Sequence, residues 1–302
     1  MAKTFLERLR AGDRMVIDGA TGTNHQQNGL PPGVPSEDWV FDEPAKVEAL
    51  HRAFVQAGSD IILTCTFGGT VLRLREASQY ADRAHELNVR AAQLARNAAN
   101  ERSGVFVAGS MGPTGKLMEP LGELTRDEVV ENYREQAKAL TEGGVDLLLL
   151  ETFFALDEAQ AAIEGVKLGS DLPLVVSFSY DQGTRTMMGL RPSQVVQAIV
   201  PLGVAAIGAN CGKSPEAMLE IVTEMNAQNT GLPIWTKPNA GLPHLIGELE
   251  IYDATPEIMA GFAQKYIAAG AQIVGGCCGS TPGHVAAMAQ AVKNFSRTTV
   301  SP

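Results

Sequence analysis

Residues 146–167 read DLLLLETFFALDEAQAAIEGVK and contain the two local patterns that decide the fold of this chain. The first is a short apolar run, Asp146–Leu150, of the kind that forms a parallel strand buried on both faces. The second is Leu156–Lys167, where apolar residues recur at three- and four-residue spacing, the period of an amphipathic helix. The stretch therefore predicts one strand–helix unit.

The same unit recurs along the whole chain. The predicted strands are Met15–Ile17, Ile61–Cys65, Val105–Ala108, Asp146–Leu150, Leu174–Phe178, Ala205–Gly208, Ile234–Thr236 and Ile273–Gly275. The predicted helices are Pro44–Ala57, Asp82–Asn100, Arg126–Glu142, Leu156–Lys167, Pro192–Val200, Pro215–Gln228, Pro256–Ala268 and Pro282–Lys293. Eight units of comparable length predict a single α/β domain, a (β/α)₈ TIM barrel.

A doubly wound open sheet is the competing architecture. Such a sheet usually binds its ligand at one switch point, whereas polar residues here follow many different strands, so we favour the barrel. No linker or low-complexity segment divides the chain, and we predict one domain over residues 1–296 with a flexible tail at 297–302. Two long connections, residues 19–42 and 238–253, interrupt the pattern, and loops of this length often bind ligands.

Composition excludes several classes of protein. A net charge of -10 argues against a nucleic-acid partner or an anionic membrane surface, because both require clustered Lys and Arg. No apolar run approaches the roughly 20 residues of a membrane span. The N-terminus has no signal-peptide pattern, and 4 cysteines in 302 residues are not a disulfide scaffold. We therefore expect a protein of the reducing cytoplasm.

Residues that carry chemistry cluster directly after the predicted strands. In a (β/α)₈ barrel these positions meet at one face, where the active site lies. In chain order they are Asp18, Cys65, Thr66, Gly112–Gly115, Glu151, Ser177, Cys211, Asn239, Cys277 and Cys278. We therefore expect one site at the mouth of the barrel.

Three of the cysteines predict a metal centre. Cys277 and Cys278 are adjacent, which disfavours a disulfide between them, and Cys211 follows a neighbouring strand. Three thiolates with one position left open are a ligand set for catalytic Zn²⁺. Because three thiolates make the ion electron-rich, it suits binding a substrate thiol better than activating water, and alkyl transfer to sulfur follows.

The remaining candidate site residues are single polar side chains that form no cluster in the sequence. A carboxylate at the end of a buried strand needs a partner, so we predict that Asp18 and Glu151 bind a cationic group such as a substrate ammonium. Cys65 has no cysteine near it in sequence and is interpreted as a non-ligand. Of the histidines, His51 and His85 lie in predicted helices and are expected in solvent, while His244 is kept as a candidate site residue.

With these residues assembled, the chain resembles the homocysteine S-methyltransferase family over nearly its whole length. The matching motifs are Asp18-Gly19-Ala20-Thr21-Gly22-Thr23, the stretch from Ala57 to Gly68, Gly112–Gly115, Glu151-Thr152, Asn210-Cys211 and Gly275-Gly276-Cys277-Cys278-Gly279. Residues 238–243, PNAGLP, are similar to the homocysteine-binding module of cobalamin-dependent methionine synthase. The last two cysteine motifs together are the most specific part of the resemblance.

The resemblance implies a (β/α)₈ barrel with a three-cysteine zinc site, a substrate homocysteine and a product methionine. Cys211, Cys277 and Cys278 would be the zinc ligands, and an asparagine at the position of Asn239 is a candidate fourth ligand when substrate is absent. Asp18 and Glu151 would hold the amino-acid portion of homocysteine as the catalytic pair. We place Gly19, Ala20, Thr66 and Ser177 beside them as further substrate contacts.

The methyl donor stays open at this point. The chain ends after the barrel without an Asp-x-His-x-x-Gly cobalamin motif, so a methylcorrinoid such as methylcobalamin would be carried by a separate corrinoid protein. S-methylmethionine or betaine as a free donor is the alternative. Betaine is disfavoured, because the betaine-using branch has a tyrosine where this chain has Thr152 and bulky aromatics where it has Gly68-Gly69. An aromatic cage for a quaternary ammonium would have only Trp39 and Phe67 to draw on.

Two further readings concern the acceptor and the activity. A corrinoid-partnered methyltransferase could act on another thiol within a demethylation pathway. A zinc-storing or structural barrel is the non-enzymatic reading, and the open fourth position of a three-cysteine site argues against it. The sequence does not specify an oligomeric state.

Overall fold

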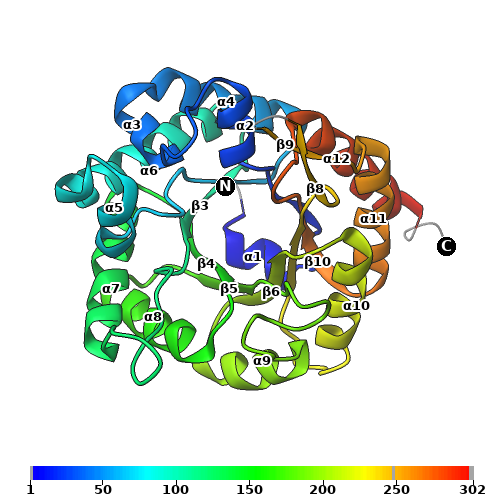
Figure 1. Cartoon of the computed structure of the whole chain (residues 1–302). Helices are drawn as coiled ribbons and strands as arrows, with labels where there is room; N and C mark the ends of the chain where they lie inside the picture. The colour runs from blue at the N-terminus through cyan, green and yellow to red at the C-terminus, as the bar shows by residue number, and fades with distance from the viewer. Residues whose placement is uncertain (1–2, 247–248, 299–302) are drawn as a thin grey trace.

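Eight parallel strands form a barrel in which neighbours along the chain are also neighbours in the ring (Figure 1). The computed structural model describes residues 3–246 and 249–298. The barrel strands are β1 (Met15–Val16), β2 (Ile61–Leu63), β3 (Phe106–Met111), β4 (Leu147–Phe153), β5 (Leu174–Phe178), β6 (Ala206–Cys211), β7 (Ile234–Pro238) and β10 (Ala271–Val274). A parallel bridge between Ile17 and Ile61 joins β1 to β2 and closes the ring. The predicted (β/α)₈ barrel is confirmed, and the open doubly wound sheet is wrong.

One main helix follows each barrel strand and packs outside the ring. These helices are α4 (Pro44–Ala57), α6 (Ala84–Ala99), α7 (Arg126–Glu142), α8 (Leu156–Gly169), α9 (Pro192–Ile199), α10 (Pro215–Asn226), α11 (Pro256–Ala268) and α12 (Pro282–Thr298). Ser214 and Thr255 cap α10 and α11, each followed by a proline that has no N–H to satisfy. Helix α12 continues two residues into the predicted tail at 297–302, and residues 299–302 lie outside the described residues.

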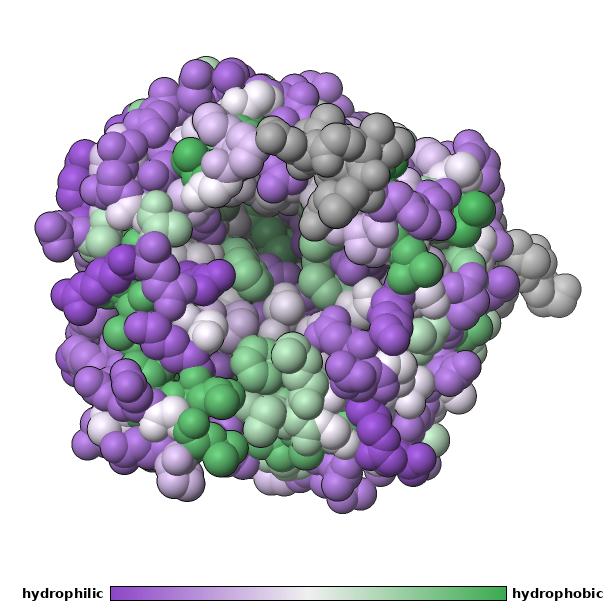
Figure 2. All heavy atoms as spheres, in the orientation of Figure 1, coloured by the Kyte–Doolittle hydropathy of each residue, from purple (hydrophilic) through white to green (hydrophobic). Residues whose placement is uncertain are grey.

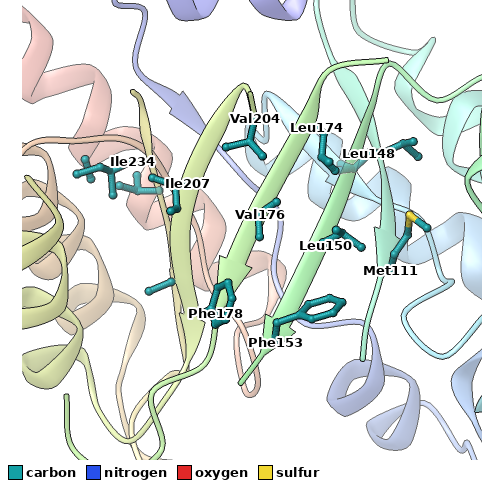
Figure 3. Packing of buried hydrophobic residues seen from close by; sticks show 14 of the residues in the cluster. Met111, Leu148, Leu150, Phe153, Leu174, Val176, Phe178, Val204, Ile207 and Ile234 are labelled. Atoms are coloured by element: carbon teal, nitrogen blue, oxygen red, sulfur yellow. The ribbon is translucent and has the colours of Figure 1, made fainter. Parts of the chain in front are cut away.

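The barrel strands separate two layers of core. In β4, Leu147 and Leu149 face the barrel interior, whereas Leu148 and Leu150 pack in the layer between strands and helices. Figure 3 shows this outer layer, where residues of β3 to β7 lie side by side. Burial on both faces explains why the strands read as unbroken apolar runs instead of alternating patterns.

A short N-terminal helix, α1 (Phe5–Arg10), closes one end of the barrel and is visible at the centre of the ring in Figure 1. Its buried residues Phe5 and Leu9 belong to the same cluster as the inward-facing strand residues. The ring of Phe5 meets Phe106 of β3 edge-on, with the two centroids 5.8 Å apart. The other end of the barrel, at the carboxyl ends of the strands, carries the loops.

Both long connections contain structure that the sequence did not predict. The first holds α2 (Gly22–Gln27), the 3₁₀ turn η1 (Ser36–Asp38) and α3 (Trp39–Asp42). The second holds an antiparallel hairpin of β8 (Pro243–Ile246) and β9 (Leu249–Tyr252). The shorter connections add α5 (Val71–Ala77), η2 (Ala81–Arg83) and η3 (Val200–Leu202). Among the described helices, none has the length and apolar content of a membrane span.

The prediction that His51 lies in solvent is wrong. His51 is 1% exposed and belongs to the buried stripe of α4, together with Val47, Leu50, Phe54 and Val55. These positions follow the helical period, so the histidine occupies a core position on the side of α4 that packs against α2. His85 lies in solvent as predicted and pairs with Glu142.

Candidate functional site

A cavity of about 360 Å³ opens at the carboxyl ends of the barrel strands. In Figure 2 it is the hollow at the centre of the face. Its lining comes from the first long connection and from the ends of six barrel strands, β2, β3, β4, β6, β7 and β10. Six of the rim residues that the sequence singled out line this cavity: Cys65, Thr66, Glu151, Cys211, Cys277 and Cys278. Asp18, Gly112–Gly115, Ser177 and Asn239 are not among the lining residues.

Three cysteine side chains converge at this cavity. Cys211 is the last residue of β6, and Cys277 and Cys278 follow β10. Their Sγ atoms all lie within 4.8 Å of one another, and those of Cys211 and Cys277 are 3.0 Å apart. Of the residues that the structure describes, these form the one cluster of three or more His, Cys, Asp or Glu side chains able to hold a metal ion.

The donor set fits a zinc ion. Thiolates at about 2.3 Å from a tetrahedral zinc lie about 3.8 Å from one another. The three Sγ atoms lie within 4.8 Å of one another, close enough to share one ion. All three cysteines line the cavity, so a fourth coordination position would face the open space of the cavity. A magnesium or calcium ion prefers oxygen ligands and does not suit three sulfurs.

The thiols also polarise one another. Hydrogen bonds from Cys211 and Cys277 lower the pKa of Cys278, and contacts with Tyr252 and Lys237 lower it further. The same sulfur contacts raise the pKa of Cys211 well above its usual value. Negative charge therefore concentrates on Cys278, the thiolate that accepts from its neighbours.

Asn239 holds the two cysteine-bearing loops together. Its Oδ1 accepts the backbone N–H of Cys278 at 3.1 Å, and its Nδ2 donates to the carbonyl of Gly212 at 2.9 Å. The oxygen and the nitrogen of the side-chain amide therefore connect Cys278 with Gly212, the residue directly after Cys211. The asparagine predicted as a candidate fourth ligand thus positions the cysteines in this structure.

A second asparagine, Asn210, connects the ends of three strands. Its Oδ1 accepts the N–H of Thr152 at 2.9 Å and the hydroxyl of Ser177 at 2.6 Å, while its Nδ2 donates to Thr152 Oγ1. Ser177, predicted as a substrate contact, is fully buried in this network and lies outside the cavity lining. The sequence identified Asn210 only as part of a motif, because its partners lie on other strands.

Glu151 places a carboxylate in the cavity beside the thiols. It is 5% exposed and follows the four leucines of β4, where its Oε1 accepts a very short hydrogen bond from Ser110 Oγ. Burial raises the pKa of Glu151, with the Lys237 ammonium opposing the rise. Glu151 lines the cavity, and its role as a group that binds a substrate cation stays a prediction.

Asp18 lies just behind the cavity and already has a cationic partner. Its Oδ2 accepts the N–H of Leu63 at 2.7 Å, and its Oδ1 lies 3.4 Å from Nζ of Lys237. Burial raises the pKa of Asp18 to about 6, although the lysine opposes this effect. The predicted ammonium partner of Asp18 is therefore, in this structure, an ammonium of the protein itself.

Lys237 lines the cavity but was not predicted from the sequence as a site residue. Burial on its own would lower the pKa of Lys237, but Asp18, Glu151 and Cys277 together raise it, so the side chain stays charged. A signal was present, because the lysine directly follows the predicted strand Ile234–Thr236 and so falls on the rim. No neighbouring residue in the sequence indicated that it would point inward.

The opposite wall of the cavity comes from the first long connection and the loop after β2. Glu37 is buried and accepts the N–H of Gly68 at 2.6 Å, and burial raises its pKa. Cys65 donates its S–H to the carbonyl of Ser36, and burial raises the pKa of this thiol well above its usual value. Cys65 is thus a neutral wall residue, separate from the three-thiol cluster.

The other predicted contacts divide between the cavity and its surroundings. Ala20 and Thr66 line the cavity, whereas Gly19 lies under it, where its backbone approaches Phe54 and the carbonyl of Ser280 closely. His244 lies exposed on the hairpin, pairs with Asp253 at 3.2 Å, and is not among the lining residues.

Comparisons with known proteins agree with this geometry. The homocysteine S-methyltransferase family matches residues 15–292, and the chain belongs to this family. It is 32% identical over 302 residues to methionine synthase of Mycobacterium tuberculosis and 33% identical over 305 residues to that of Mycobacterium leprae. These alignments cover 94% and 95% of this chain but 25% of each relative, so the chain spans about a quarter of their length.

Solved structures show the same fold. The metallated form of the homocysteine methyltransferase MmuM from Escherichia coli superposes with a TM-score of 0.78 at 22% identity, covering 92% of this chain and 96% of that one. Its apo form superposes with a TM-score of 0.71. At this level of identity the likeness concerns the barrel alone.

Proposed function

We propose that this chain is a zinc-dependent thiol methyltransferase that methylates homocysteine to form methionine. The observation that carries the proposal is the juxtaposition of three thiols and the Glu151 carboxylate in one cavity. Membership of the homocysteine S-methyltransferase family supports the same acceptor. A reducing compartment, the cytoplasm, would keep the thiols free for metal.

In this proposal the cysteines and Glu151 have separate roles. Cys211, Cys277 and Cys278 would hold the zinc ion, which when bound supplies a Lewis acid that lowers the pKa of the acceptor thiol. Glu151 would accept hydrogen bonds from the acceptor's ammonium and fix its orientation. The acceptor thiol loses its proton to water, and its sulfur lone pair forms a bond to the methyl carbon. The bond between that carbon and the donor breaks, and the donor keeps the electron pair. Positioning of the two reactants supplies much of the rate.

We further propose that the donor is a methylcorrinoid carried by a separate protein. Large apolar side chains are exposed on the connections that follow β2, β3 and β5: Phe67 (39%), Leu117 (40%), Leu121 (66%), Met187 (63%) and Met188 (44%). Figure 2 shows apolar residues gathered below the central hollow. An apolar rim around a catalytic mouth suits a macromolecular partner, whereas a small donor needs no such surface.

A betaine-type donor has less support. Among the described lining residues, Phe67 is the one aromatic side chain, while Trp39 packs against His25 and the Lys46 ammonium outside the cavity. A quaternary ammonium is bound best by several aromatic faces. S-methylmethionine, a sulfonium, stays the alternative free donor.

The test is a parallel assay of donors and acceptors. Zinc-loaded protein and homocysteine are incubated separately with methylcobalamin, methyltetrahydrofolate, S-methylmethionine and betaine, and methionine is measured. We expect methionine with methylcobalamin and its loss in Cys278→Ser. Full activity of the Cys278→Ser variant would contradict the zinc mechanism, and equal rates with unrelated thiols would favour the demethylation reading. Activity with S-methylmethionine alone would contradict the corrinoid donor.

A further inference from the structure

The barrel strand between the two cysteine-bearing strands carries a buried lysine. β7 stands between β6 and β10 in the ring, and its next-to-last residue, Lys237, is 4% exposed. The residue after it, Pro238, is paired in register with Cys211, and its carbonyl accepts the N–H of Cys277 at 2.7 Å. Lys237 therefore belongs to the strand that joins the two parts of the three-cysteine cluster, and it lines the same cavity.

The Lys237 ammonium is charged and only partly neutralised. Burial alone would lower the pKa of Lys237, but Asp18, Glu151 and Cys277 together raise it. Among the described residues its Nζ has one ion-pair partner, Asp18 Oδ1 at 3.4 Å, and a strong charge-assisted hydrogen bond would measure about 2.8 Å. Within the described lining of the cavity, Lys237 is the one cationic side chain. A negative charge that arises in the cavity therefore has this lysine to offset it.

Binding of the acceptor sulfur would add such a charge beside the three thiols. A zinc ion bound by three thiolates carries one net negative charge, and a thiolate at its open position adds a second. Charge in a buried site is costly unless a group of opposite charge compensates it. Glu151 lines the same cavity and would add to the repulsion, so a compensating cation has a definite role there.

We propose that Lys237 offsets the negative charge that the zinc centre gains when the acceptor sulfur binds as a thiolate. The inference rests on the proposed function and deepens it, because it names a residue outside the metal ligands that favours the anionic form of the acceptor sulfur. In this role Lys237 makes the open coordination position selective for anionic ligands over neutral ones.

Two small ligands isolate the charge of the atom that binds the metal. 2-Mercaptoethanol binds as a thiolate and carries no carboxylate or ammonium, whereas imidazole binds as a neutral ligand. Their dissociation constants are measured calorimetrically with zinc-loaded protein, and the thiol is also followed in Co²⁺-loaded protein through its thiolate-to-cobalt charge-transfer band. Neither readout depends on a methyl donor or on the amino-acid portion of homocysteine.

Lys237→Met should weaken the binding of 2-mercaptoethanol by about 10- to 100-fold, the loss expected when one unit charge is removed from a site of intermediate dielectric constant. Its affinity for imidazole should not fall. Lys293→Met, at an exposed position of α12, is the matched control and should leave both constants unchanged. An equal loss of affinity for both ligands, or no loss for the thiol, would overturn the role of Lys237.

Loss of Lys237 also removes the partner of Asp18, so Lys237→Met could unfold the protein. Comparing Asp18→Asn with Asp18→Asn/Lys237→Met avoids this, because neither variant leaves the Asp18 carboxylate buried without its cation. The double variant should bind 2-mercaptoethanol about 10- to 100-fold more weakly than Asp18→Asn. Equal constants in these two variants would overturn the inference alone. Wild-type protein that binds no zinc, or whose zinc binds no thiol, would overturn the proposed function as well.

Discussion

Two residues beside the site adopt left-handed backbone conformations that are unusual for side chains with a Cβ. Cys211 has φ 57° and Thr152 has φ 66°, and both stand at the carboxyl ends of barrel strands. Each such residue costs about 1–3 kcal/mol and persists only when its surroundings hold it. Asn210 is the residue that holds Thr152, and it precedes Cys211 directly. The strain therefore lies where Glu151 and a thiol are aimed into the cavity.

Removing the Asn210 side chain should destabilise the protein, because the backbone of Thr152 would no longer be held in its strained conformation. Asn210→Ala would break its bonds to Thr152 and Ser177 and leave buried polar groups unpaired, at a cost of about 2–4 kcal/mol in unfolding free energy. We also expect weaker zinc binding, because Cys211 follows directly. Chemical denaturation and zinc titration measure both effects. Asn100→Ala, at an exposed position after α6, is the control. Unchanged stability would contradict this role of Asn210.

At this scale the sequence predicts some contacts and not others. The convergence of Cys211, Cys277 and Cys278 was predictable, because each follows a strand and parallel strands end at one rim. The pairing of Lys237 with Asp18 was not, since it depends on which side chains point inward across the barrel mouth. A carboxylate near a substrate site can be expected from its position, but its partner requires the fold.

Among the elements, the β8–β9 hairpin supports the three-cysteine cluster. Tyr252, at the end of β9, hydrogen-bonds the Cys278 sulfur. Its ring lies against Gly279, where an added Cβ would come within 2.3 Å of Tyr252 Cγ. Gly279 also has φ 79°, which glycine adopts without strain. The glycine after the cysteine pair thus lets the hairpin approach the site.

Gly279→Ala should therefore affect the site as well as stability. A left-handed alanine costs about 1–2 kcal/mol, and displacement of Tyr252 should add to this and weaken zinc binding. Gly104→Ala is the matched control, because Gly104 has φ 83° with no atom within 4 Å of an added Cβ. It should lose stability by the strain alone and keep its zinc affinity. Thermal unfolding and zinc titration compare the two, and equal zinc affinities would contradict the role of the hairpin.

The contact between α2 and α4 should make the protein sensitive to acid. His25 is 1% exposed, neither ring nitrogen has a hydrogen-bond partner, and burial lowers its pKa from 6.5 to about 4. Burial likewise lowers the pKa of His51 to about 3. As the pH falls below 6.5 the unfolded state takes up protons first, so stability present above pH 6.5 is lost towards pH 4.

His25→Phe should reduce this loss. Its unfolding free energy should fall less between pH 6.5 and 4 than that of wild-type protein, by up to about 3 kcal/mol, the worth of the His25 shift. Denaturant titrations across this range give the difference. If the unfolding free energy of His25→Phe fell with pH as steeply as that of wild-type protein, the proposed role of His25 in acid sensitivity would be wrong.

For the whole molecule, stability depends on a barrel whose far end is closed by α1. Phe5→Ala should remove a ring that is 2% exposed against Phe106 and lower the unfolding free energy by about 3–5 kcal/mol. Leu168→Ala, at a position 63% exposed, should change it by less than about 0.5 kcal/mol. Denaturant unfolding measures both, and a similar small change in Phe5→Ala would mean that α1 does not contribute to the core.

The barrel itself was predictable, because eight apolar runs alternate with amphipathic stretches and the bounds of α4, α7 and α11 follow from local patterns. The closing helix α1 and the hairpin were not, since short elements of this kind are stabilised by the surface they cover instead of by their own periodicity. The proposed function depends on residues at the rim, where the fold brings together side chains that are distant in the sequence.

The most direct test of the central claim is X-ray absorption spectroscopy of the zinc-loaded protein with and without homocysteine. We expect one zinc per chain with three sulfur ligands from Cys211, Cys277 and Cys278, and a fourth sulfur when homocysteine is added. A protein that binds no zinc, or a zinc whose sulfur count does not change with homocysteine, would contradict it.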